Sequence, residues 1–522
     1  MEKVEWEDVQ RIVLSGYKHL PCSAYVLWSF QPENPARKKE WLAELAKRLT
    51  PAVADEQREG TSKSDAADKA SSKKQPAINL ALTASGLRHL GIAEPELNSF
   101  SLEFIEGMAP QPASKTQIPR RTNILGDLGA SSPACWDWGG WNKNCDIDGL
   151  LLLFAADDKS LDEQIEIEGA KLDQVAERDP IVLKGRLFCP DMKEHFGYVD
   201  GLSQPKIEGR PKKREKNKAP EKNNTSEIKS GSEVKPGEFL FGYLNERRAR
   251  VTNGQGRDIR RNGTYLVFRQ LEQDVAAFNA FLSDVAKRIG ENEEWVAARL
   301  LGRWRNGDPL VTKGPAAQAA NSKGPDAKAA DAKAPDAQAT DSKGPDAKAA
   351  NAKEPDAKAA DSKNDFLYYY EDRSGLMCPI GAHIRRANPR DSLRPDPETA
   401  LHLSKMHRII RRGRPYGEKW EPGAEKPDGK KAERGMLFIA LNADIAGQFE
   451  MIQHSWLNNP HFNGLYSGTD PISHFTEGES ITIQSRPVNL HICRPAPFVR
   501  VRGGAYFFLP GIRALRDIAA SA

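Results

Sequence analysis

Two short motifs in this chain combine residue types that could carry out redox chemistry together. The segment 378–390, CPIGAHIRRANPR, holds His383 followed by a run of arginines. The segment 196–205, FGYVDGLSQP, places one acid, Asp200, between glycines. A haem enzyme divides its work in this way, because an imidazole holds the iron from one side and a proton-transfer group acts over the other.

His383 is the candidate iron ligand. A lone histidine is more often a structural residue, and the plain alternative here is a solvated basic strand. The small residues Gly381 and Ala382 leave room beside the imidazole. The arginines that follow suit the two propionates of a haem, because a guanidinium binds a carboxylate through two parallel hydrogen bonds, and we assign Arg386 to the cofactor. Cys378 is an alternative thiolate ligand, but the motif context favours the histidine.

Asp200 is the candidate proton-transfer group. Asp-Gly pairs usually mark turns, so a turn without chemistry is the alternative. The flanking glycines, Gly197 and Gly201, would also let the backbone approach a flat cofactor closely. We therefore assign Gly201 to cofactor binding and expect Asp200 to accept and return one proton.

A third motif, HRIIRRGRPYG at 407–417, supplies a candidate cation. Its plain interpretation is a basic strand that ends in a Pro-Tyr-Gly turn. A guanidinium fixed near iron would instead stabilise negative charge that develops on a departing oxygen. Arg411, Arg412 and Arg414 are the candidates for this role.

Alternating strand-like and helix-like runs must position these motifs. Buried strands are predicted at 149–155, 263–269, 435–441 and 505–509. Helical spacing of apolar residues predicts helices over 160–176 and 274–289, and a third that carries Ile445, Phe449, Ile452 and Trp456 on one face. This rhythm indicates an α/β or α+β sandwich, and periodicity alone does not decide between them.

Two polar segments interrupt the pattern. Residues 206–237 are rich in Lys, Glu, Asn, Ser and Pro, which predicts a surface loop. Residues 313–363 repeat a ten-residue unit, KGPDAKAADS and variants, in about five copies. Proline in each unit interrupts helix growth and alanine alone cannot build a core, so we expect an insert that the chemistry does not need.

Composition limits the classes of protein that fit. The 76 basic and 72 acidic residues nearly cancel, at a net charge of +4, which gives little support for a nucleic-acid partner. There is no apolar stretch of 18 residues, and the start MEKVEWED does not look like a secretory signal. Six cysteines without close spacing indicate reduced thiols. We expect a cytoplasmic protein with neither membrane nor nucleic-acid partners.

Together the motifs resemble the dye-decolorizing peroxidase family. Its Gly-x-x-Asp-Gly motif matches 197–201, its Ala-His-Ile-Arg-x-x-Asn-Pro-Arg segment matches 382–390, and its Ile-Arg-Arg-Gly-x-x-Tyr-Gly segment matches 410–417. Shorter matches lie at 16–21, 81–86, 448–450 and 502–507. The long loops resemble the larger branch of the family. Tyr198-Val199, where Phe-Arg is common, and Gly413, which is asparagine in some branches, are departures.

The resemblance implies an α+β fold of two ferredoxin-like domains, antiparallel sheets with helices, that enclose one haem b per chain. The domains would span 1–210 and 237–522, with a polar loop at 211–236 and the repeat insert at 313–363 within the second. It implies that His383 ligates the iron, with Asp200 as distal acid and Arg411 as distal arginine. The expected activity is reduction of hydrogen peroxide coupled to one-electron oxidation of bulky small-molecule donors such as dyes or phenolics.

Three other functions stay open at this point. A haem-processing protein that releases iron, or one with chlorite-type chemistry, could share the scaffold. A haem carrier or sensor without turnover is a second alternative, although it would need neither Asp200 nor Arg411. A basic interaction module that binds an unknown partner through the repeat insert is the third.

Overall fold

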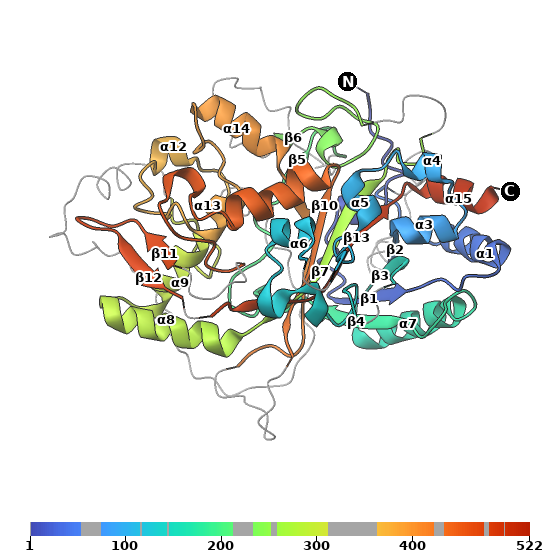
Figure 1. The fold of residues 1–522 in the computed structure, drawn as a ribbon, viewed down its shortest axis with the longest axis horizontal. Coiled ribbons are helices and arrows are strands. Elements are labelled where there is room, and N and C mark those ends of the chain that lie inside the picture. Colours follow the sequence, from blue (N-terminus) through green and yellow to red (C-terminus); the bar gives the residue numbers. More distant parts are fainter. Residues whose placement is uncertain are drawn as a thin grey trace, which may run out of the picture.

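In the part of the chain that the structure describes, nine strands form one antiparallel sheet in the order β4-β1-β3-β2-β13-β7-β10-β8, with β9 paired to β10. It was traced in a computed structural model (Figure 1). The structure describes residues 2–53, 75–114, 117–142, 146–211, 233–251, 258–311, 363–421, 433–473, 480–494 and 496–521.

The first half of the sheet has the strand order of a ferredoxin-like unit. β1 (Cys22–Trp28) lies between β4 (Ile181–Arg186) and β3 (Gly149–Ala155), and β2 (Ala77–Leu82) lies outside β3. Each neighbouring pair is antiparallel. Two helices, α1 (Pro35–Ala46) and α7 (Asp158–Leu172), connect β1 to β2 and β3 to β4. This is a β-α-β-β-α-β unit with the strand order 4-1-3-2.

The second half repeats that order with longer connections. β7 (Thr264–Gln273) lies between β13 (Val499–Leu509) and β10 (Gly435–Asn442), and the short strands β8 (Ile410–Arg411) and β9 (Arg414–Tyr416) pair with β10. α8 (Val275–Ile289) follows β7. The two halves meet where Phe508 of β13 pairs with Leu82 of β2. The expected α+β fold with two ferredoxin-like units is confirmed.

The remaining described elements are short and cover the sheet or flank it (Figure 1). The helices among them are α3 (Ala84–His89), α4 (Glu94–Leu97), α5 (Leu102–Glu106), α6 (Arg120–Leu125), α9 (Glu293–Leu301), α12 (Tyr368–Glu371), α13 (His383–Ala387), α14 (Pro397–Met406) and α15 (Ile512–Ala520). Two small ladders lie outside the main sheet: β5 (Lys206–Ile207) with β6 (Glu233–Val234), and β11 (Ser480–Ile483) with β12 (Leu490–Cys493).

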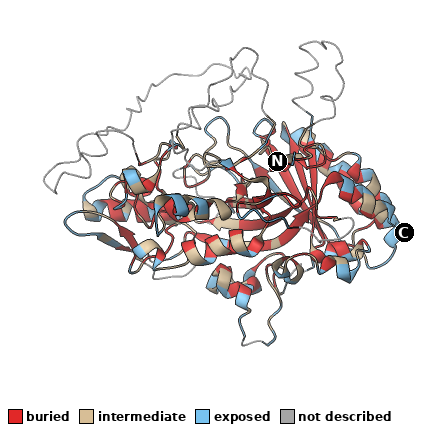
Figure 2. Cartoon of the chain, turned by 90° about the horizontal axis from the view of Figure 1, so that it is seen from above, coloured by how far each residue is buried: buried red, intermediate tan, exposed pale blue. Residues whose placement is uncertain are grey.

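Both faces of the sheet are covered, so the central strands are buried throughout (Figure 2). Every residue of β1, β2 and β3 is buried. Strands that are covered on both faces lose the alternation of polar and apolar residues. This explains why an unbroken apolar run such as GLLLLFA forms a strand here.

Most predicted elements are confirmed, with shifted ends. The strand at 149–155 is β3, and the helix expected over 160–176 is α7, which begins earlier because the Asp157 carboxylate accepts the Ser160 amide. β13 begins at Val499 rather than 505, through an irregular register at Val501/Gly503. The third helix forms as two consecutive π-helical stretches, Ile445–Glu450 and Ile452–Leu457, with its four apolar residues buried.

Two predictions concern residues that the structure does not describe. The insert at 313–363 lies outside the described residues except for Lys363, and so does 212–232 of the polar loop. The boundaries proposed for the two domains stay predictions. Among the described residues, no helix is both long enough and apolar enough to cross a membrane.

Candidate functional site

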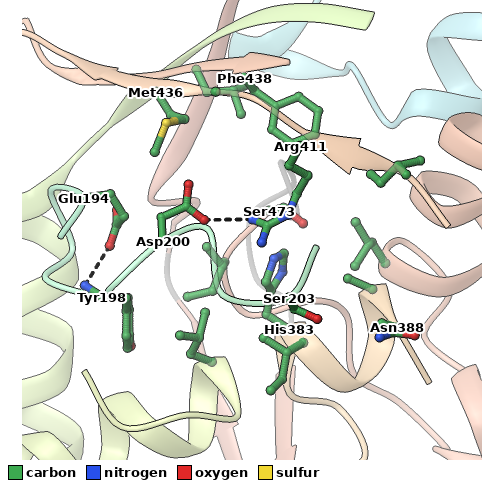
Figure 3. A pocket seen from close by; sticks show the side chains of 18 of the residues that line it. Glu194, Tyr198, Asp200, Ser203, His383, Asn388, Arg411, Met436, Phe438 and Ser473 are labelled. Carbon is green, nitrogen blue, oxygen red and sulfur yellow. Dashed lines mark hydrogen bonds and ion pairs between the residues drawn. The ribbon is translucent and has the colours of Figure 1, made fainter. Parts of the chain in front are cut away.

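A cavity of about 300 Å³ brings the predicted chemistry together (Figure 3). His383, Asp200, Gly201 and Arg411 all line it, although they lie far apart in the sequence. Apolar side chains from the sheet and the π-helical segment form much of the remaining wall: Leu271, Met436, Phe438, Phe449, Ile452 and Leu457. A few polar groups in a largely apolar concave site is typical of a cofactor pocket.

His383 begins the short helix α13 and reaches into the cavity, where Figure 3 shows its imidazole directed toward Asp200 and Arg411. Its Nδ1 lies 3.1 and 3.0 Å from the two carboxylate oxygens of Asp470. An Nδ1–H donated to this carboxylate leaves Nε2 as the ring nitrogen available to a ligand. Histidines that bind metals are commonly held and made more basic by a carboxylate in this way.

Asp470 is the functional residue that sequence reasoning missed. It is fully buried, and its Oδ1 also accepts the amides of Ile472 and Ser473. Burial raises the pKa of Asp470, but the hydrogen bond and charge of His383 and the amide of Ser473 outweigh it, so this pKa lies well below its usual range. The carboxylate is therefore ionised and orients His383. The two residues are 87 positions apart, and no local motif links them.

Asp200 and Arg411 form an ion pair on the other wall of the cavity. Arg411 Nη1 donates to Asp200 Oδ1 at 3.0 Å, and each side chain is about one-third exposed. Arg411 ends β8, opposite Ala440 of β10. Its backbone amide donates to Gln204 Oε1 at 2.9 Å, which ties β8 to the loop that carries Asp200. The turn interpretation of Asp200 is compatible with this placement, because Gly201 has φ +78°.

The neighbouring arginines of the third motif point elsewhere. Arg412 donates to the carbonyls of Ile12 and Val13, each at 2.7 Å. Arg414 donates to carbonyls of residues 16, 17 and 20. Both guanidiniums hold the N-terminal segment against the sheet, so Arg411 alone of the three candidates faces the cavity.

Two further arginines line the cavity without a carboxylate partner among the described residues. Arg408 makes one long contact, from Nη2 to Ser203 O at 3.5 Å. Burial, together with the charges of Arg390 and Arg411, lowers the pKa of Arg408 to about 9. Arg303 donates only to the Gly307 and Lys363 carbonyls and to the side-chain oxygen of Asn364. Buried cations normally have counterions, so the cavity fits a ligand that carries carboxylates, as haem does.

Arg386 does not line this cavity, contrary to the role assigned to it. Its guanidinium is fully buried and donates to backbone carbonyls of Gly381, Trp456 and Asn459, among others. Arg385 is equally buried and pairs with Asp372. Arg385 and Arg386 therefore hold α13 in place through buried hydrogen bonds and an ion pair. The basic run is neither a solvated strand nor a contact to the cavity ligand.

Cys378 also lies away from the cavity lining. Its thiol is fully buried, and burial raises its pKa to about 11. A thiol that is not readily ionised is a poor iron ligand. The thiolate alternative to His383 therefore has no support in this geometry.

No protein-family model matches the chain. Two curated relatives are similar along most of their length. A dye-decolorizing peroxidase of Exidia glandulosa is 28% identical over 466 residues, which cover 84% of this chain and 75% of the relative. The multifunctional dye peroxidase DyP2 of an Amycolatopsis species is 28% identical over 464 residues, covering 85% and 82%.

Solved structures agree with these relatives. An ancestral D-type dye-decolorizing peroxidase superposes with a TM-score of 0.70 at 25% identity, over 100% of both chains. In sequence and in fold, the chain is similar to dye-decolorizing peroxidases along most of its length. A dye-decolorizing peroxidase in complex with 2,6-dimethoxyphenol has the same fold, with a TM-score of 0.69 at 23% identity, over 99% of this chain and 100% of the other.

The structure explains two positions at which the chain departs from the motifs of this family. Tyr198 is buried and its hydroxyl donates to the Ala297 carbonyl at 2.8 Å, while Val199 lines the cavity. At Gly413 an added Cβ would lie 2.8 Å from the Leu437 carbonyl oxygen. Asparagine therefore cannot replace Gly413 unless the strands shift. Assignment to the larger branch of the family stays a prediction.

Proposed function

We propose that the protein is a haem-dependent peroxidase that reduces hydrogen peroxide and oxidises bulky organic donors, such as dyes or phenolics, in one-electron steps. One observation carries the proposal: a single apolar cavity holds a carboxylate-backed histidine on one wall and an Asp–Arg pair on another. We infer the donor class, dyes and phenolics, from the names of the curated relatives and from the 2,6-dimethoxyphenol complex of a structural neighbour.

The proposed cofactor is haem b, one per chain. His383 Nε2 would hold the iron, while Asp470 fixes the ring orientation. Arg303 and Arg408, rather than Arg386, would meet the propionates, because their guanidiniums lack carboxylate partners among the described residues. When bound, haem supplies the iron centre at which peroxide reacts and the oxidising equivalents that donors then reduce.

The remaining steps belong to side chains of the protein. Asp200 Oδ1 is held by Arg411, which leaves Oδ2 to take a proton from the inner oxygen of peroxide and return it to the outer oxygen. The Arg411 guanidinium stabilises the negative charge that develops as water leaves. The apolar wall limits water around this exchange.

The alternatives are less well supported. A haem carrier needs no proton-transfer group, yet Asp200 and Arg411 both face the cavity. None of the curated relatives described above carries the name of an iron-releasing or chlorite-converting protein. The expectations of a cytoplasmic location, and of neither nucleic-acid nor membrane partners, stay predictions.

The test is peroxide-dependent turnover by protein loaded with haem. We expect a Soret band after loading, and oxidation of a bulky dye and of 2,6-dimethoxyphenol that requires both haem and peroxide. Haem-free protein is the control for background oxidation. Stable haem binding without turnover of either donor would instead support a carrier.

A further inference from the structure

Asp200 is the last residue of a tight hairpin formed by residues 192–200. The Asp200 amide donates to the Met192 carbonyl at 3.1 Å, and the Glu194 amide donates to the Tyr198 carbonyl at 2.9 Å. Lys193 and Val199 form an isolated antiparallel bridge between these two bonds. The turn requires a left-handed residue, which is supplied by Gly197 at φ +92°. The position of Asp200 therefore depends on how firmly this hairpin is closed.

The Glu194 carboxylate closes the hairpin from inside. Its Oε2 accepts the Phe196 amide at 3.0 Å, and its Oε1 accepts the Tyr198 amide at 3.0 Å. Figure 3 shows Glu194 turned toward Tyr198 beside Asp200. The Glu194 carbonyl accepts the Gly197 amide at 2.9 Å, and the amides of Phe196 and Tyr198 donate to the Glu194 side chain.

The same carboxylate joins the hairpin to the sheet. Gln273, the last residue of β7, donates its Nε2 to Glu194 Oε2 at 2.8 Å. The backbone amide of Gln273 donates a hydrogen bond to the Arg434 carbonyl at 2.9 Å. Glu194 thus connects the segment that carries Asp200 to the rigid centre of the second half of the molecule.

The hairpin needs such a connection because it separates two cavities. A smaller cavity of about 90 Å³ lies next to the main one, and Glu194, Asp200, Gly201 and Arg411 line both. The rings of Phe196 and Tyr198 pack in the core beside Phe278, while the Glu194 carboxylate fixes the backbone of the hairpin through its hydrogen bonds. Geometry near the reacting atoms is sensitive to displacements of about 1 Å.

We propose that Glu194 is the positioning residue for Asp200, holding the 192–200 hairpin so that the Asp200 carboxylate faces both Arg411 and the peroxide. This inference rests on the proposed function, because it assigns Glu194 a part in the same proton transfer. Glu194 does not touch the reactants, and its effect passes through Asp200.

The test is a double-mutant cycle with Glu194→Gln and Asp200→Asn, measured on haem-loaded protein. Glutamine places an NH₂ group against one of the two turn amides, so that one hydrogen bond is lost and the hairpin shifts. We expect haem content to be retained and the rate of reaction with peroxide to fall roughly tenfold or more. The later rate of donor oxidation should change little, which a general loss of structure would not produce.

In the Asp200→Asn background, Glu194→Gln should cause no further loss, because two residues that act through one group are not additive. Asp191→Asn is the matched control and should behave as wild type, because Asp191 is exposed and its carboxylate lies 3.8 Å from Lys419 Nζ at the surface. If Glu194→Gln fails to fold, Gln273→Met removes one donor to the same carboxylate and should repeat the pattern more weakly.

Each outcome decides the matter. A peroxide rate within twofold of wild type, or an effect that adds in full to Asp200→Asn, would overturn the role of Glu194 while leaving the proposed function intact. A loss of haem content with an unchanged rate per haem would assign Glu194 a purely structural role. An Asp200→Asn protein that reacts normally would instead overturn the proposed proton transfer, and the role of Glu194 with it.

Discussion

At the scale of single residues, the site depends on pairs of polar side chains in which one residue orients the other. Asp470 holds His383, and Arg411 holds Asp200. Each pair turns a flexible polar side chain into one with a defined direction, which is what catalysis by preorganised groups requires. The chemistry therefore resides in pairs of residues rather than in the single residues that motifs reveal.

His383→Ala should lose stable haem, because the iron loses its bond from the protein. The measurement is the ratio of Soret to protein absorbance after loading and gel filtration. His454→Ala, at an exposed histidine of the π-helical segment, is the control and should retain haem. Equal haem content in both variants, with unchanged spectra, would refute the assignment of His383.

The buried His195 should make stability depend on pH. Burial lowers its pKa from 6.5 to about 4, although its hydrogen bond to the Tyr416 carbonyl acts in the opposite direction. In the unfolded chain His195 is therefore protonated below about pH 6.5, whereas in the folded protein it is protonated only below about pH 4. Stability falls as pH drops through this window, by about 2 kcal/mol between pH 7 and 5.

Urea unfolding at both pH values tests this expectation. In His195→Gln the loss of stability between pH 7 and 5 should be smaller than in wild type by that amount. Parallel losses in the two proteins would show that His195 is protonated in the folded state.

Compact motifs in the sequence pointed to residues that line one cavity, whose roles stay predictions, but the sequence did not reveal the residues that only the fold brings together. Asp200, His383 and Arg411 line one cavity as expected. Arg386 was misplaced because α13 turns it into the interior, where the carbonyls around 456–468 need donors. Asp470 was missed because only the tertiary structure brings it to His383.

At the scale of elements, backbone geometry sets where the side chains point. The break between β8 and β9 falls at Gly413, and it separates Arg411, which faces the cavity, from Arg414, which is buried against the N-terminal segment. Periodicity predicted the long buried strands and α8 well, because apolar runs report burial directly. It could not predict the π-helical geometry of 445–457, which depends on tertiary contacts.

Gly413→Ala should disturb this break, because the new Cβ would lie 2.8 Å from the Leu437 carbonyl oxygen of β10. We expect a loss of about 1–3 kcal/mol in the free energy of unfolding and a slower reaction with peroxide, since Arg411 moves with the strand. Gly169→Ala is the matched control: it lies within α7, with open space at its Cβ. That variant should be as stable as wild type or more so, by roughly 0.5–1 kcal/mol.

At the scale of the whole molecule, two ferredoxin-like units share one sheet, and the cavity belongs mainly to the second. His383, Arg411 and the apolar wall come from 264–509, while the hairpin with Asp200 follows the first unit. The strand order could not be read from periodicity, because identical apolar runs fit several sheet topologies. It was expected only through the family resemblance.

Deletion of residues 314–361 should leave the fold and haem binding intact. The deletion keeps Val311, which is buried, and Lys363, whose carbonyl accepts from Arg303 at 2.8 Å. Shortening a connection of this composition changes closure entropy only slowly with length. Thermal unfolding and haem content of the deletion protein, beside the full chain, are the measurements. A protein that precipitates or loses haem would show that the folded protein needs the repeat.

The central claim is that Asp200 and Arg411 handle peroxide opposite His383. The most direct measurement is the rate at which the haem spectrum changes after stopped-flow mixing with hydrogen peroxide, in wild type, Asp200→Asn and Arg411→Leu. We predict that both variants keep wild-type haem content while the rate falls roughly 10²–10³-fold, the usual effect of removing one preorganised group. Rates equal to wild type in both variants would contradict the account.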